Sequence, residues 1–228
     1  MEYRPILLTM ALLFTTGCAS FTSGDTRIPK KDLKRMLSDK EIKPAAELRV
    51  TWENFPYKNA IDTIGEGRAQ PEAPAPVPVP IKDMAWLQEH AREIFGEAGL
   101  YDAQNGTGTI TLALTSYGRW TYRELFSSFL VDTGWIFIFP ATLRVNHHLA
   151  AEFTGPDMRA AAEELVQSRT TFHALLFPLY PFFPPGAKEH SLLKKMLWKS
   201  AADVYARIKR GGTPVPAGAS GASSPKTN

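Results

Sequence analysis

The chain contains a single cysteine, Cys18, among its 228 residues. One thiol cannot close a disulfide within the chain, and it cannot supply a zinc site with several thiolate ligands. Any fold of this chain therefore depends on a packed apolar core. The hydrophobic fraction of 44% is ordinary for a globular protein, so such a core is available. The length favours one domain with tails.

The residues before Cys18 have the order of an export signal. Arg4 precedes the apolar run 6–14, and the small residues Thr15, Thr16 and Gly17 follow it. A helix needs ~20 apolar residues to span a bilayer, so this run is too short to be a membrane span. A charged start, a short apolar stretch and a small-residue cleavage site predict a signal peptide over residues 1–17.

The segment Phe14-Thr-Thr-Gly-Cys18 resembles the lipobox of bacterial lipoproteins. The resemblance implies that the signal is cut before Cys18 and that its thiol carries a diacylglyceryl group, palmitate-type chains that anchor the protein to a membrane. Thr15 departs from the family, which more often has Leu or Val there. In diderm members of that family, an Asp after the cysteine marks retention at the inner membrane, so the resemblance implies that this chain, with Ala19, lies at the outer membrane, facing the periplasm. The alternative is a plain secreted protein with an isolated cysteine.

The rest of the chain divides by composition. We expect residues 18–45 to be the lipidated cysteine and a tether, in which Leu33, Met36 and Leu37 would permit one short helix. Residues 46–210 are expected to form a single domain, interrupted by the Pro-rich loop 71–80. Residues 211–228 are rich in Gly, Ser, Ala and Pro and predict a disordered tail.

Hydrophobic periodicity predicts the elements of that domain. Alternation predicts strands over 48–52, 107–116 and 143–153, and apolar spacing of three and four predicts helices over 82–98 and up to Arg210. Residues 158–173 fit a helix or a returning strand, and the turn at 155–157 favours the strand. The prediction is an α+β fold, a mostly antiparallel sheet covered on one face by two helices. This outline resembles small envelope lipoproteins and, in outline only, the lipopolysaccharide-assembly lipoprotein.

Two segments, 129–140 and 172–185, stand out because both are rich in aromatic residues. Neither is long enough to cross a bilayer as a helix. A hairpin of 143–153 with 160–172 would bring both segments to one pole of the domain. There they would face a membrane or a partner, or else fold back as core. The candidate residues are Trp135, Phe137, Phe139, Phe177, Tyr180, Phe182 and Phe183.

The sequence offers no catalytic, metal or cofactor site. His147 and His148 point to opposite faces of a strand, and His147 is expected in the core. Ser191-Leu-Leu-Lys194 lacks the companion motifs of penicillin-binding enzymes. The last helix has a basic face, expected to be solvated, with anionic lipid as the alternative contact. A net charge of +3 does not favour nucleic acid.

These features predict a non-enzymatic, membrane-anchored binding or scaffold module with a possible envelope protein partner. Two alternatives stay open: a periplasmic enzyme acting on cell-wall or lipid substrates, and an assembly factor for an outer-membrane complex. A nucleophile and a base within hydrogen-bond reach in a pocket would favour the enzyme.

Overall fold

The structure is a computed structural model, and it describes residues 21–24, 26–56, 75–119, 141–156, 158–172, 185–211 and 213–214. The elements in chain order are β1 (Phe21–Ser23), α2 (Lys30–Ser38), β2 (Glu47–Pro56), α3 (Ile81–Glu97), β3 (Thr109–Arg119), β4 (Ala141–Thr154), β5 (Met158–Phe172), α5 (Pro185–Lys209) and β6 (Thr213–Pro214).

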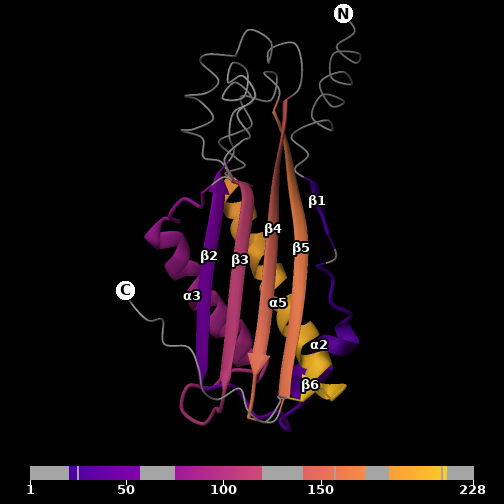
Figure 1. Ribbon diagram of the computed structural model, residues 1–228. Helices are drawn as coiled ribbons and strands as arrows, with labels where there is room; N and C mark the ends of the chain where they lie inside the picture. The colour runs from indigo at the N-terminus through magenta and orange to yellow at the C-terminus, as the bar shows by residue number, and fades with distance from the viewer. Residues whose placement is uncertain are drawn as a thin grey trace, which may run out of the picture.

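The described strands form one sheet in the order β1-β5-β4-β3-β2, with β6 also paired to β5 (Figure 1). β2 runs parallel to β3 because α3 carries the chain back between them, and the other pairings are antiparallel. The predicted hairpin is confirmed, since β4 and β5 pair from Ala141–Phe172 to Thr154–Arg159. The α+β fold and its mostly antiparallel sheet are therefore as predicted.

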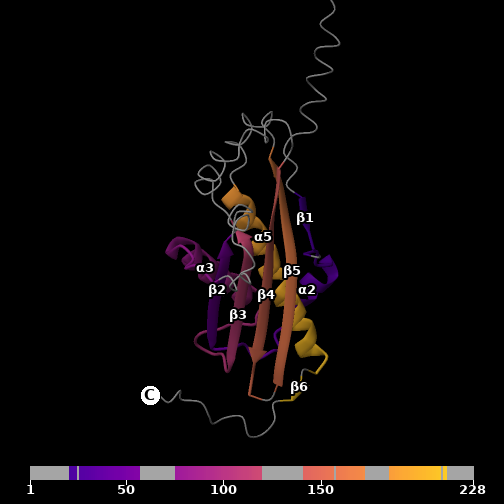
Figure 2. The ribbon, with the colours of Figure 1, turned by 45° about the horizontal axis from the view of Figure 1, so that its top comes forward.

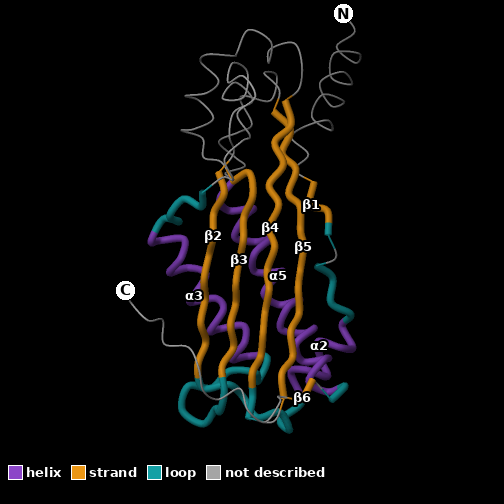
Figure 3. Tube along the Cα trace, in the orientation of Figure 1, coloured by secondary structure: helices purple, strands orange, loops and turns teal. Residues whose placement is uncertain are grey.

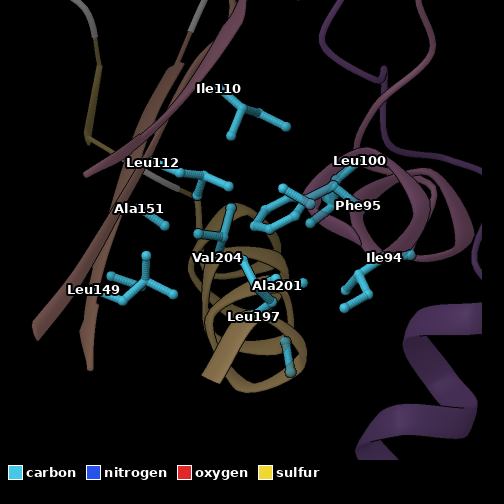
Figure 4. Close-up of a cluster of buried hydrophobic side chains, with 14 of the residues drawn as sticks. Ile94, Phe95, Leu100, Ile110, Leu112, Leu149, Ala151, Leu197, Ala201 and Val204 are labelled. Carbon is cyan, nitrogen blue, oxygen red and sulfur yellow. The ribbon is translucent and has the colours of Figure 1, made fainter. Parts of the chain in front are cut away.

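Alternating side chains give the sheet one buried face. In β3, Ile110, Leu112 and Leu114 are buried, whereas Thr111 between them is exposed. The two long helices, α3 and α5, cover this face (Figure 2). Their apolar stripes, with Phe95 in α3 and Leu197 in α5, pack on the sheet to form the core (Figure 4). The opposite face carries no helix from the described residues.

The N-terminal part of the domain differs from the prediction. Residues 30–38, expected in a tether, form α2, and Met36 and Ala45 are buried in the core. Phe21–Ser23 adds a strand to β5, and Thr213–Pro214, expected in the disordered tail, pairs with the other end of β5. Packing against α5 stabilises a nine-residue helix that would be marginal alone. The structured chain thus begins well before residue 46.

Candidate functional site

The residues predicted to face a membrane or partner lie outside the described residues, as does Cys18. These are Trp135, Phe137, Phe139, Phe177, Tyr180, Phe182 and Phe183. The described strands nevertheless place the ends of both aromatic segments. Ala141, which follows the first segment, pairs with Phe172, where the second segment begins. We call this end of the domain, where β2, β3 and β5 end and β4 begins, the upper pole (Figure 3).

A row of buried polar residues crosses the sheet just below the upper pole. Asn54 of β2, Ser116 of β3 and His147 of β4 are direct neighbours in register, and all three are buried under the helices. The neighbouring row toward the middle of the sheet is Trp52, Leu114 and Leu149. The core therefore changes from apolar to polar at this row. We take the row of Asn54, Ser116 and His147, with its neighbours, as the candidate functional site.

Ser116 and His147 form a hydrogen-bonded pair. Trp52 Nε1 donates to Ser116 Oγ at 2.9 Å, and Ser116 Oγ lies 2.9 Å from His147 Nδ1. His147 Nε2 lies 4.0 Å from Glu189 Oε1 of α5. We assign the proton to Nε2, because it then faces a carboxylate while Nδ1 accepts from the serine hydroxyl. Burial, and secondarily the charge of Arg119, lowers the pKa of His147 to about 4, so the ring is neutral at pH 7.

Arg119 ties this row to both helices. Its Nε donates to Glu189 Oε1 at 2.8 Å, a second guanidinium nitrogen contacts Asp83 of α3, and the guanidinium lies 4.8 Å from the Trp52 ring. Burial opposes the charge of Arg119, but the carboxylates of Glu189 and Asp83 more than offset it and raise its pKa. The five segments β2, β3, β4, α3 and α5 are thus joined by one polar cluster.

A glycine turns Arg119 toward the helices. The register between β2 and β3 shifts after Phe55, so that Pro56 faces Arg119 and Gly118 is the extra residue. Gly118 has φ +75°, and a Cβ there would lie 2.7 Å from the carbonyl oxygen of Arg144. Without this bulge, strict alternation would place Arg119 on the open face of the sheet.

Two further histidines stack on Trp86 beside the cluster. The ring of His90 lies 4.3 Å from the Trp86 ring between centroids, and the ring of His190 lies 4.1 Å away. Both stack on one indole, so the imidazoles occupy its opposite faces and cannot share a metal ion. In the described ranges, no group of three His, Cys, Asp or Glu side chains is arranged to hold a metal.

A hydrogen-bonded serine and histidine would favour an enzyme, but the Ser116 hydroxyl is not accessible to solvent. Ser116 is 0% exposed and His147 is 1% exposed, which confirms the prediction of a core histidine. Ser191 of the S-x-x-K pattern is exposed on α5. The cluster as it stands joins secondary-structure elements and offers no accessible nucleophile at Ser116.

The amino-acid sequence places His147 in the core but indicates the rest of this cluster only in part. Asn54, Ser116 and His147 fall in phase with the buried apolar positions of their strands, where a polar residue needs a partner. Arg119 could not be recognised in this way, because the bulge at Gly118 moves it out of phase with the other residues of β3.

Among the helices that the structure describes, none is long and apolar enough to cross a membrane. No protein-family model matches the chain, and no curated protein matches it significantly. Its function has to be argued from its own residues.

Proposed function

We propose that the chain is a lipid-anchored lipoprotein of the bacterial envelope, a non-enzymatic binding or scaffold module whose upper pole rests on the membrane. One observation carries the proposal: β1, the strand nearest to Cys18, joins the sheet at the same end as Ala141 and Phe172, the residues that border the two aromatic segments in the sequence. Phe21 pairs with Arg169, three residues before the end of β5 at Phe172.

The connection between anchor and domain is short. Cys18 precedes Phe21 by three residues, and an extended chain spans at most about 3.6 Å per residue. An acyl group on Cys18 therefore begins within about 11 Å of the Cα of Phe21. With two or three acyl chains in the bilayer, the anchor is stable, and the upper pole is held against the lipid headgroups.

Described residues at this pole also suit a membrane surface. Ile81, the first residue of α3, is 88% exposed, and Val77 and Tyr117 are 46% and 47% exposed. Phe55 stacks on Tyr117 with 5.0 Å between ring centroids. Burying one such side chain contributes ~1.5–3 kcal/mol, so several provide a second membrane signal beside the lipid.

The anchor is tested by Cys18→Ser in a diderm bacterium. The wild-type protein is expected in the outer-membrane fraction with an acylated N-terminal cysteine by mass spectrometry. The variant is expected to be soluble or uncleaved. A variant that is still processed and membrane-bound would show that Cys18 is not the anchor.

The pole is tested separately with the unlipidated Cys18→Ser chain and vesicles of phosphatidylethanolamine and phosphatidylglycerol. Ile81→Glu with Tyr117→Glu should weaken co-sedimentation by tenfold or more. Phe182→Ser with Phe183→Ser should do the same while barely changing the melting temperature. Leu37→Glu is the matched control, because Leu37 is 47% exposed on α2, away from the pole. Equal binding by all variants would contradict a membrane-facing pole.

A second candidate function is a periplasmic hydrolase, favoured by the Ser116–His147 hydrogen bond with Glu189 behind the imidazole. A fluorophosphonate probe labels activated serines. Labelling of the wild-type chain that Ser116→Ala abolishes would establish the enzyme. An unlabelled protein, as the burial of Ser116 leads us to expect, would exclude this role for Ser116.

A further inference from the structure

A cavity of about 340 Å³ lies between α2 and the C-terminal turns of α5. This is the half of the domain away from the upper pole (Figure 1). One wall comes from the segment before α2 and from α2 itself, and the other from one stripe of α5. The charged residues of the lining are Arg27, Asp32, Arg35, Lys199, Asp203, Lys209 and Arg210.

The two lysines of the lining are held by carboxylates of the domain itself. Lys209 Nζ lies 2.7 Å from Asp39 and 2.8 Å from Glu41. Lys199 contacts Asp203 and lies 3.6 Å from Glu164 of β5. These pairs fix the shape of the cavity wall, and they leave little of the lysine charge for a ligand.

Two of the arginines, Arg35 and Arg210, are placed differently. Arg35 in the last turn of α2 and Arg210 after α5 line the cavity from opposite walls. In the described part of the chain, no carboxylate lies within ion-pair distance of either guanidinium, and both residues are exposed. Arg27 adds a third guanidinium from the segment before α2.

We propose that this cavity binds a phosphate monoester, with the phosphate held between the guanidinium groups of Arg35 and Arg210. A guanidinium presents a planar fork of donors that matches the oxygens of a phosphate group. One guanidinium group occupies both oxygens of a carboxylate, whereas the oxygens of a phosphate dianion can accept hydrogen bonds from two or three guanidinium groups. A volume of about 340 Å³ leaves room for a small organic group beside the phosphate.

The inference does not depend on the proposed function, because the cavity and the upper pole lie in different halves of the domain. If the pole rests on the membrane, the cavity opens to the aqueous phase, and a water-soluble ester has direct access. A lipid with a phosphate monoester head would have to reach the cavity from a separate membrane surface.

The experiment is calorimetric titration of the full unlipidated chain with glycerol 3-phosphate. Arg35→Gln and Arg210→Gln remove one fork each, and Lys195→Gln is the control, since Lys195 is exposed on α5 outside the cavity. A hydrogen bond to a charged group is worth enough that each arginine variant should bind about tenfold more weakly or worse. The control should bind within about twofold of the wild type, and melting temperatures should stay unchanged, as for surface substitutions generally.

Vesicles containing phosphatidic acid form the second arm of the experiment. Binding of glycerol 3-phosphate that both arginine variants lose supports a soluble ligand. Binding of the vesicles alone, lost in the same variants, supports the same phosphate chemistry on a lipid. Binding that falls equally in Lys195→Gln, or no binding of either probe at millimolar phosphate, would overturn the proposal.

Discussion

The buried His147 should make the domain sensitive to acid, and the magnitude follows from its position. The folded-state pKa of His147 is about 4, because burial first, and the charge of Arg119 second, disfavour the imidazolium. In the unfolded chain the pKa returns to its ordinary 6.5. Between these values the unfolded state binds more protons, so stability is present above pH 6.5 and is lost as the pH falls toward 4. One pKa unit is worth about 1.4 kcal/mol, so the loss by pH 4 is about 3 kcal/mol.

A second buried group has the opposite effect. Burial, and secondarily Asp203, raises the pKa of Glu164 to about 7, from an ordinary value of 4.5. Its ionisation therefore costs stability at neutral pH, and protonation relieves that cost as the pH falls from 7 to 4.5. In the wild-type protein the two groups partly cancel, so the acid sensitivity of His147 is hidden.

Two substitutions separate these effects. Glu164→Gln removes the compensating group, and His147→Asn removes the imidazole while keeping an acceptor near the position of Nδ1 for Ser116. Urea unfolding followed by circular dichroism at pH 8, 7, 6, 5 and 4 measures the free energy of unfolding of each variant. Between pH 7 and pH 4, the free energy of unfolding of Glu164→Gln should fall by about 3 kcal/mol more than that of the Glu164→Gln/His147→Asn double variant. Equal pH slopes for these two proteins would refute the assignment of a buried, neutral His147.

Four further substitutions, one of them a control, test the packing. Ser200→Ala should stabilise the domain by about 1 kcal/mol in thermal unfolding, because the Ser200 hydroxyl is buried without a hydrogen-bond partner among the described residues. A loss of stability would show that the hydroxyl has a partner. Gly118→Ala should destabilise the domain by about 2 kcal/mol or more, because φ is +75° and the Cβ meets the Arg144 carbonyl. As its control, Gly96→Ala should gain about 0.5–1 kcal/mol, because Gly96 lies within α3 and its Cβ would meet only the Tyr101 carbonyl oxygen, at 3.9 Å. Equal effects of the two substitutions would contradict the bulge. Met36→Ala should lower the free energy of unfolding by about 2–5 kcal/mol, because Met36 is buried in the core. An unchanged value would show that residues 30–38 are a tether and not part of the packed domain.

The sequence predicts the long elements because each carries a hydrophobic period. β2, β3, β4, α3 and α5 each span ten or more residues and carry at least three apolar residues in phase, which is enough to set both the type of element and its buried face. Three-residue β1 is too short to show a period. In α2, Met36 has too few apolar neighbours to outweigh the surrounding lysines, and its burial depends on α5, which lies far along the chain.

The candidate site was less predictable than the fold. In-phase polar residues could have indicated the row of Asn54, Ser116 and His147, but that these residues are neighbours depends on the pairing of three strands. Arg119 and Glu189 meet only after the bulge at Gly118 has turned one strand and α5 has packed on the sheet. The arginine cavity is similarly a product of two helices that are distant in sequence.

The pairing of β1 with β5 also has a consequence for the order of folding. β3, β4 and β5 are sequential antiparallel strands, and α5 follows them directly, so most of the sheet forms from neighbouring segments. The partner of Phe21 is Arg169, which lies 148 residues later in the chain (169 − 21). Closing such a long loop is entropically costly until the rest of the sheet exists, so β1 docks late. A protein acylated at Cys18 would therefore be anchored through a flexible connection until β1 pairs with β5. Only then would the upper pole be held against the membrane.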